Sequence, residues 1–143
     1  MTEGPPRRTV PGARRKARKR AVDILYESEM RDVAALDILR DKTARAEPPI
    51  SGYTATLVEG VAEHRTRIDE LISEYATGWT LDRMPPVDRN ILRVAAYELL
   101  WRDDIDAPVA ISEAVELAKS LSTDDSPRFV NGLLDRLAAQ ATP

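Results

Sequence analysis

Apolar residues recur every three or four positions along most of the chain, which is the spacing of amphipathic helices. No convincing run of strict apolar–polar alternation, the pattern of a half-buried strand, interrupts them. The spacing predicts helices over about residues 13–30, 33–46, 53–75, 86–101, 112–121 and 126–137, with a short connector at 79–84 that could hold one helical turn. We therefore expect an all-α fold, a compact bundle of about six or seven helices in two subdomains.

Individual residues refine this reading. Ser51 is a candidate N-cap, and Gly78 is a natural stop after the long helix predicted over 53–75. Gly60, inside that helix, indicates close packing or a kink. His64 lies at the edge of the same apolar stripe, where a structural or surface role is expected. Residues 103–108 read as an acidic loop.

The length of 143 residues fits one domain, which we place at residues 12–143. Residues 1–11 contain three prolines and one glycine with little apolar content, and a disordered tail is expected there. The basic N-terminus lacks the apolar core of a signal peptide, and no stretch approaches a membrane span. These features predict a soluble, cytoplasmic protein.

The residues that carry most enzyme chemistry are scarce or scattered. The chain has no cysteine, one histidine and six glycines that form no phosphate-binding loop. No HExxH, CxxC or GxSxG pattern occurs, and the acids of the 103–106 loop lack the spacing of a calcium-binding loop. We therefore expect neither catalysis nor a cofactor nor a metal.

Charge is distributed very unevenly. Residues 1–20 carry eight Lys/Arg and one acid, net +7, whereas the remainder carries 13 basic and 23 acidic residues, net −10. Six of the basic residues fall within Arg14–Arg20, at the start of the first predicted helix, where the helix dipole disfavours them. This segment favours a polyanionic ligand such as RNA or DNA. A solvated tail, a localisation signal and a membrane-surface patch remain alternatives. Tyr26, on the same helix, is either a stacking platform for a base or part of the core.

Two further stretches have both a structural and a functional interpretation. STDDSPRFVNG, residues 122–132, is a turn followed by a helix start. LDRMPPVDRNILRVAAYELL, residues 81–100, is a core helix with polar residues on its outer face.

Together with GARRKARKRAVDILYE, residues 12–27, and ISEAVELAKS, residues 111–120, these stretches resemble the NusB family of transcription antitermination factors. The resemblance runs from about residue 13 to 138 in the family's order. It implies a non-catalytic bacterial protein that binds the single-stranded boxA element of ribosomal RNA transcripts together with NusE, a small-subunit ribosomal protein. Other Nus factors and RNA polymerase would join indirectly.

The resemblance also implies functional residues. The RNA-binding residues carried over from the family's motifs are Arg14, Arg15, Lys16, Arg18, Tyr26, Asp125, Arg128 and Phe129. Those expected toward NusE are Tyr26, Asp82 and Asp88. Arg93 matches an arginine that either contacts a ligand or packs internally. The basic run through Lys19 and Arg20, and Pro127, depart from the family pattern.

Two questions stay open in the sequence. A helical protein-binding adaptor, with the basic arm serving solubility or a membrane surface, is the alternative function. The oligomeric state is undetermined, and a homodimer that buries the basic helix would be autoinhibitory.

Overall fold

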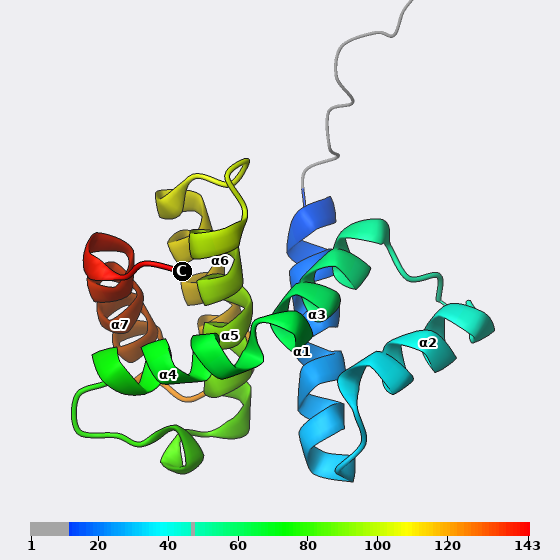
Figure 1. Ribbon diagram of the computed structural model, residues 1–143, viewed down its shortest axis with the longest axis horizontal. Helices are drawn as coiled ribbons and strands as arrows, with labels where there is room; N and C mark the ends of the chain where they lie inside the picture. The colour runs from blue at the N-terminus through cyan, green and yellow to red at the C-terminus, as the bar shows by residue number, and fades with distance from the viewer. Residues whose placement is uncertain (1–11, 47) are drawn as a thin grey trace, which may run out of the picture.

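The computed structural model describes residues 12–46 and 48–143, and in these residues the chain forms seven α-helices, one 3₁₀ turn and no strand (Figure 1). The elements are α1 (Ala13–Arg31), α2 (Ala35–Arg45), α3 (Gly52–Glu63), α4 (Arg65–Tyr75), η1 (Leu81–Arg83), α5 (Pro86–Trp101), α6 (Ala107–Leu121) and α7 (Ser126–Gln140). The all-α prediction is confirmed. The disordered tail expected at residues 1–11 lies outside the described residues.

The predicted helices differ from the observed ones mainly in two places. The prediction of a single long helix over residues 53–75 is wrong, because the helix is interrupted at His64 and forms α3 and α4. The imidazole of His64 stacks on Trp101 at the end of α5, with the ring centres 4.3 Å apart. The break preserves the apolar spacing on both sides, so periodicity alone could not locate it. Helix α6 also begins earlier than Ser112, at Ala107, because Pro108 suits the first turn of a helix.

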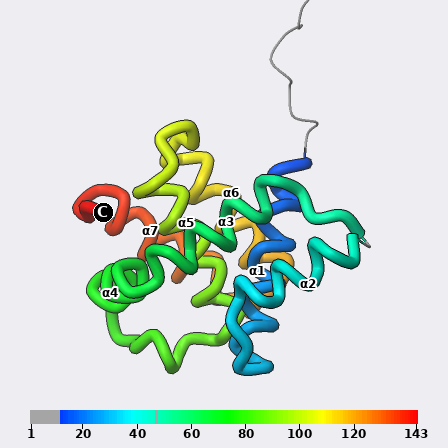
Figure 2. Tube along the Cα trace, turned by 45° about the vertical axis from the view of Figure 1, so that its right-hand side comes forward, coloured from blue at the N-terminus to red at the C-terminus, as the bar shows by residue number. Residues whose placement is uncertain are grey.

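The helices form two groups that share α5 as a common wall. Helices α1, α2 and α3 pack together on one side, and α4, α6 and α7 pack against α5 on the other. The same division is visible in Figures 1 and 2, where α1 runs beside α5 and α3 leads into α4 between the groups. Contacts of α1 and α3 with α5 join the halves, in agreement with the predicted two subdomains.

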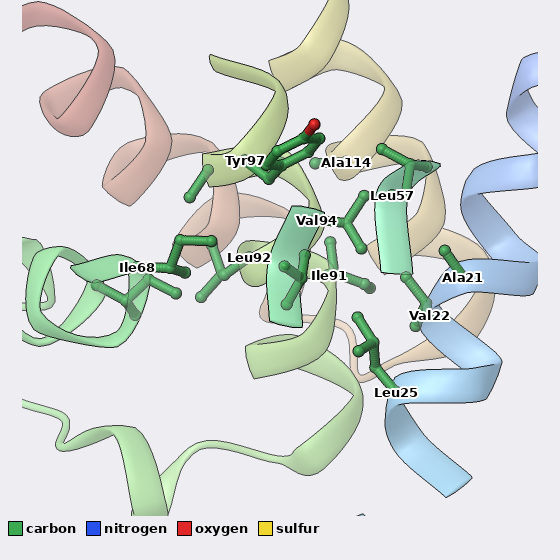
Figure 3. Close-up of a cluster of buried hydrophobic side chains, with 14 of the residues drawn as sticks. Ala21, Val22, Leu25, Leu57, Ile68, Ile91, Leu92, Val94, Tyr97 and Ala114 are labelled. Carbon is green, nitrogen blue, oxygen red and sulfur yellow. The ribbon is translucent and has the colours of Figure 1, made fainter. Parts of the chain in front are cut away.

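The core follows α5, on which every residue from Asn90 to Glu98 is buried. Figure 3 shows side chains from both groups meeting there: Val22 and Leu25 from α1, Leu57 from α3, Ile68 from α4, and Ile91, Leu92, Val94 and Tyr97 from α5. Removing this apolar surface from water is the main term that stabilises the bundle.

The expectation of close packing at Gly60 is met by Tyr97. A Cβ atom on residue 60 would overlap the Tyr97 ring. Helix α3 can therefore approach α5 this closely only because Gly60 has no side chain. Ser51 caps α3 as predicted, since its hydroxyl accepts the backbone N–H of Thr54 at 3.1 Å.

Candidate nucleic-acid interface

The basic run occupies the first two turns of α1. The residue before the helix, Gly12, has a left-handed backbone conformation with φ +90°. The first turn contains no acid, so nothing on the helix itself neutralises the arginines there. Arg15, Lys16 and Lys19 are exposed, and Arg14 is half-buried. These residues present positive charge at the end of α1 that emerges at the upper edge of the bundle in Figure 1.

Arg18 lies one turn after Arg14, on the side of α1 that faces the fold, and is only 4% exposed. Its Nε donates to both carboxylate oxygens of Glu98, each at 3.0 Å, and the hydroxyl of Tyr53 donates to the same carboxylate. Glu98 is itself buried. The expectation that Arg18 contacts RNA phosphates does not fit this geometry, because its guanidinium is paired inside the fold, where it joins α1 to α5 and α3.

Arg14 packs on the outer side of this buried cluster. Its guanidinium carbon lies 4.3 Å from the centre of the Tyr53 ring, within the range of a cation–π contact. Its Nη2 lies 3.7 Å from a carboxylate oxygen of Asp104. Burial, together with the neighbouring Glu98 carboxylate, raises the pKa of Tyr53, which keeps its phenol protonated as a donor. Arg14 is thus oriented by the body of the protein while its edge stays accessible.

A groove runs between the start of α1 and the second half of α6. Its lining includes Arg15, Lys16 and Lys19 from α1 and Leu117 and Ser120 from α6, around a volume of about 390 Å³. In Figure 1, α1 and α6 both run downward from the upper edge of the bundle, so they point in the same direction. The groove therefore leads from the basic end of α1 toward the turn that follows α6.

Tyr26 continues the same face of α1. It stands seven residues, or two helical turns, after Lys19, and its side chain is 38% exposed. Periodicity left open whether Tyr26 lies in the core or at the surface. Its exposure puts it at the surface, since a core side chain would be covered. The structure thus leaves this ring accessible to a ligand.

The turn between α6 and α7 holds the second set of expected RNA contacts. Asp125 and Arg128 are exposed, while Phe129 is partly buried. The Phe129 ring packs against Trp79, with the ring centres 5.2 Å apart. Trp79, which is 45% exposed, escaped sequence reasoning, although a large aromatic residue directly after Gly78 in a short connector is an unusual feature.

The two acids expected toward a protein partner have different environments. Asp82, in η1, is exposed, and the side chain of Thr80 lowers its pKa by hydrogen bonding. Asp88 is 1% exposed and is bound by the hydroxyls of Ser122 and Ser126. A direct partner contact does not fit the burial of Asp88, whereas Asp82 remains available.

The role of Arg93, undecided in the sequence, is internal. It is buried, and its guanidinium binds Asp69 of α4 at 2.8 Å and Glu29 of α1 at 3.3 Å. Glu29 also accepts from Arg89 and Asn90 at the start of α5. These bonds fix the last turn of α1 against α5.

The first turns of α5 therefore connect the two parts of the interface. Asp88 holds the α6–α7 turn, and Arg89 and Asn90 hold Glu29, one helical turn after Tyr26. The basic arm and the turn that carries Asp125, Arg128 and Phe129 are thus anchored around α5, with Tyr26 between them along α1.

The described ranges, 12–46 and 48–143, hold no further site of two kinds. No helix there is both long and apolar enough to cross a membrane. No group of three or more His, Cys, Asp or Glu side chains in these ranges is arranged to hold a metal ion.

Comparison with known proteins gives a consistent result. The family model described as the NusB family matches residues 15–139. The transcription antitermination protein NusB of Thermobifida fusca is 62% identical over 126 residues, covering 88% of this chain and 89% of that protein. The protein of the same name from Kineococcus radiotolerans is 57% identical over 126 residues, covering 88% and 93%.

Solved structures agree with the fold. NusB of T. maritima superimposes with a TM-score of 0.81 at 39% identity, covering 91% of this chain and 93% of the other. A crystal structure of the antitermination factors NusB and NusE in complex with double-stranded RNA contains a chain of the same fold, with a TM-score of 0.77 at 24% identity, covering 88% and 96%.

Proposed function

The chain belongs to the NusB family of transcription antitermination proteins, and we propose that it binds the boxA element of ribosomal RNA transcripts together with NusE. The observation that carries this proposal is the basic arm, with Arg15 and Lys16 exposed and Arg14 half-buried, beside a groove, on a body of net negative charge. A cationic arm attracts the RNA backbone, while the acidic body discourages general binding to nucleic acid.

Recognition divides between phosphate and base contacts. Arg14, Arg15 and Lys16 supply charge to phosphates, which gives affinity but little sequence information. Tyr26 and Phe129 offer aromatic rings to unstacked bases, and Asp125 and Arg128 offer hydrogen-bonding groups beside them. Arg18 contributes indirectly by fixing α1 through Glu98.

The partner surface lies around η1 and the outer face of α1. Asp82 is exposed there and ionised at neutral pH, as suits a basic ribosomal protein, and Tyr26 borders this surface. NusE is the partner named for the solved complex of the same fold. The pair would then recruit other Nus factors and RNA polymerase, with this chain acting as an adaptor without catalysis.

The test is fluorescence anisotropy of a labelled boxA-like RNA against a scrambled RNA of equal length, with and without NusE, over a salt series. We expect weak binding by the chain alone, tighter and more selective binding with NusE, and affinity that falls as salt rises. Equal affinity for both RNAs in every condition would mean that the arm binds polyanions without sequence preference. No RNA binding at low salt, with NusE bound, would favour a purely protein-binding adaptor.

The partner contact has its own test. Asp82→Asn should weaken the gain in RNA affinity that NusE gives, while leaving RNA binding by the chain alone unchanged. Asp37→Asn is the matched control, because Asp37 is an exposed acid on α2, far from η1 in sequence and on the other helix group. Equal effects of both variants would argue against a specific role for Asp82.

A further inference from the structure

The turn between α6 and α7 is held to the fold by a buried carboxylate. Asp88 is 1% exposed, and Ser126 is 3% exposed. Ser126 Oγ donates to Asp88 Oδ2 at 2.8 Å, and Ser122 Oγ donates to Asp88 Oδ1. One carboxylate thus binds both ends of a turn that spans only four residue steps.

A third hydroxyl extends this arrangement. Thr123 Oγ1 lies 2.8 Å from Ser126 Oγ. A hydroxyl has only one hydrogen, and that of Ser126 goes to Asp88, so Thr123 is the donor of this pair. The hydroxyls of Thr123 and Ser126 therefore form a directed chain that ends on the carboxylate and fixes the rotamers of the turn.

The surroundings of the Asp88 carboxylate supply hydrogen-bond donors even though it is buried. Asp88 lies in the first turn of α5, where the helix dipole favours negative charge, and two hydroxyls donate to its oxygens. Burying a carboxylate is costly unless such donors are present, so the three side chains depend on one another. An apolar residue at position 88 would fill space but could not orient the turn.

We propose that Asp88 is a positioning residue for RNA recognition, acting on the bases through the α6–α7 turn and not by contact. The inference rests on the proposed function. Arg128 and Phe129 lie two and three residues after Ser126 in α7, so the orientation of the first turn of α7 sets where these side chains meet the RNA. The basic arm of α1 is anchored elsewhere, through Arg18 and Glu98, and does not depend on Asp88.

This separation gives a specific expectation. Loss of the Asp88 contacts should reduce discrimination between RNA sequences, because base contacts shift, and should leave the salt dependence unchanged, because the phosphate contacts remain. A residue that only stabilises the fold would lower the melting temperature without changing either quantity in the folded protein.

The experiment compares the full chain with Ser122→Ala, Ser126→Ala and the double variant, bound to NusE, on boxA-like and scrambled RNA. The double variant should lose roughly tenfold in the ratio of the two affinities, the order expected from one misplaced hydrogen-bonding contact to a base edge, with the same salt slope. Ser122→Thr keeps the hydroxyl and should retain the ratio. Hydrogen exchange should show faster exchange at residues 122–130 in the double variant.

Ile72→Val is the control for an effect of stability alone, because it removes one methyl group from a buried site on α4 and leaves the turn intact. An unchanged affinity ratio in the double variant, or an equal loss in Ile72→Val, would overturn the role of Asp88 while leaving the proposed function standing. A native chain that fails to discriminate the RNAs would overturn both.

Discussion

Arg15 and Glu113 form a two-pronged ion pair between α1 and α6: the Nε and Nη2 atoms of Arg15 each lie 2.9 Å from a carboxylate oxygen of Glu113. Arg18 Nη1 lies 3.7 Å from the same carboxylate. The fold therefore places an acid within its own basic arm, where it orients Arg15 and offsets part of the repulsion among neighbouring cations.

This pair predicts a pH dependence of stability. The hydrogen bond from Arg15 is the largest cause that lowers the pKa of Glu113 in the folded protein. The resulting stabilisation is complete above the unfolded-state pKa of about 4.3, declines as the pH falls below it, and is lost below the folded-state pKa. Urea denaturation of the native chain and Glu113→Gln should therefore differ at neutral pH and converge in acid.

Glu116 supplies the control for this prediction. It lies on the same helix but pairs with Lys119, one turn away on the exposed surface, at 3.3 Å. Glu116→Gln should change the pH profile little. A constant difference between the native chain and Glu113→Gln down to the lowest pH would argue that the ion pair does not respond to protonation.

The buried pair of Arg18 and Glu98 predicts a large loss of stability when one partner is removed. Arg18→Met keeps most of the apolar stem but leaves the Glu98 carboxylate buried with only the Tyr53 hydroxyl. Breaking a buried ion pair in this way typically costs about 3–5 kcal/mol, measurable by urea denaturation. The double variant Arg18→Met with Glu98→Gln should recover part of the loss, and strictly additive effects would contradict coupling between them.

The contact between Gly60 and Tyr97 predicts opposite effects at two glycines. Gly60→Ala should destabilise the protein by about 1–3 kcal/mol, because the new methyl group overlaps the Tyr97 ring and overpacking outweighs the gain in helix propensity. Gly52→Ala, at the open start of α3, should be neutral or stabilising. Thermal melts compare the two, and equal behaviour would contradict the packing argument.

Arg18 shows what the sequence could and could not reveal about the site. Its place in a run of cations suggested a surface role. Yet it precedes Val22 by four residues and Leu25 by seven, so the helical period already put it on the inner face. Its partner Glu98 lies 80 positions later in the chain, and no local pattern contains that pairing.

The helices themselves were largely predictable, because apolar periodicity, Ser51 and the prolines act locally. The break at His64 was not, since it depends on stacking against Trp101 from another helix. Asp88 is a similar case: its spacing to Ile91 and Leu92 puts it on the buried face of α5, but only the fold brings Ser122 and Ser126 to it. Tertiary partners of polar residues are what the sequence alone lacked.

The last prediction concerns the exposed cations of the arm. Arg15→Gln with Lys16→Gln should weaken binding to boxA-like and scrambled RNA alike, since phosphate contacts carry little sequence information. For single-stranded RNA, losing two phosphate contacts should lower the slope of log affinity against log salt by about 1.4. Glutamine is preferable to charge reversal here, because an acid at position 15 would face Glu113. The stronger change, charge reversal of both Arg14 and Arg15, should abolish RNA binding and still retain helical content, because neither side chain lies in the core.

The matched control removes two cations of equal charge from another surface. Arg40 and Arg45 on α2 have side chains 74% exposed, and each pairs only with an acid on its own helix among the contacts of the described residues. Arg40→Gln with Arg45→Gln changes the net charge by the same amount. If RNA binding depended on overall charge, both double variants would show the same loss of affinity and salt slope. A loss confined to the arm variant would place the phosphate contacts on α1.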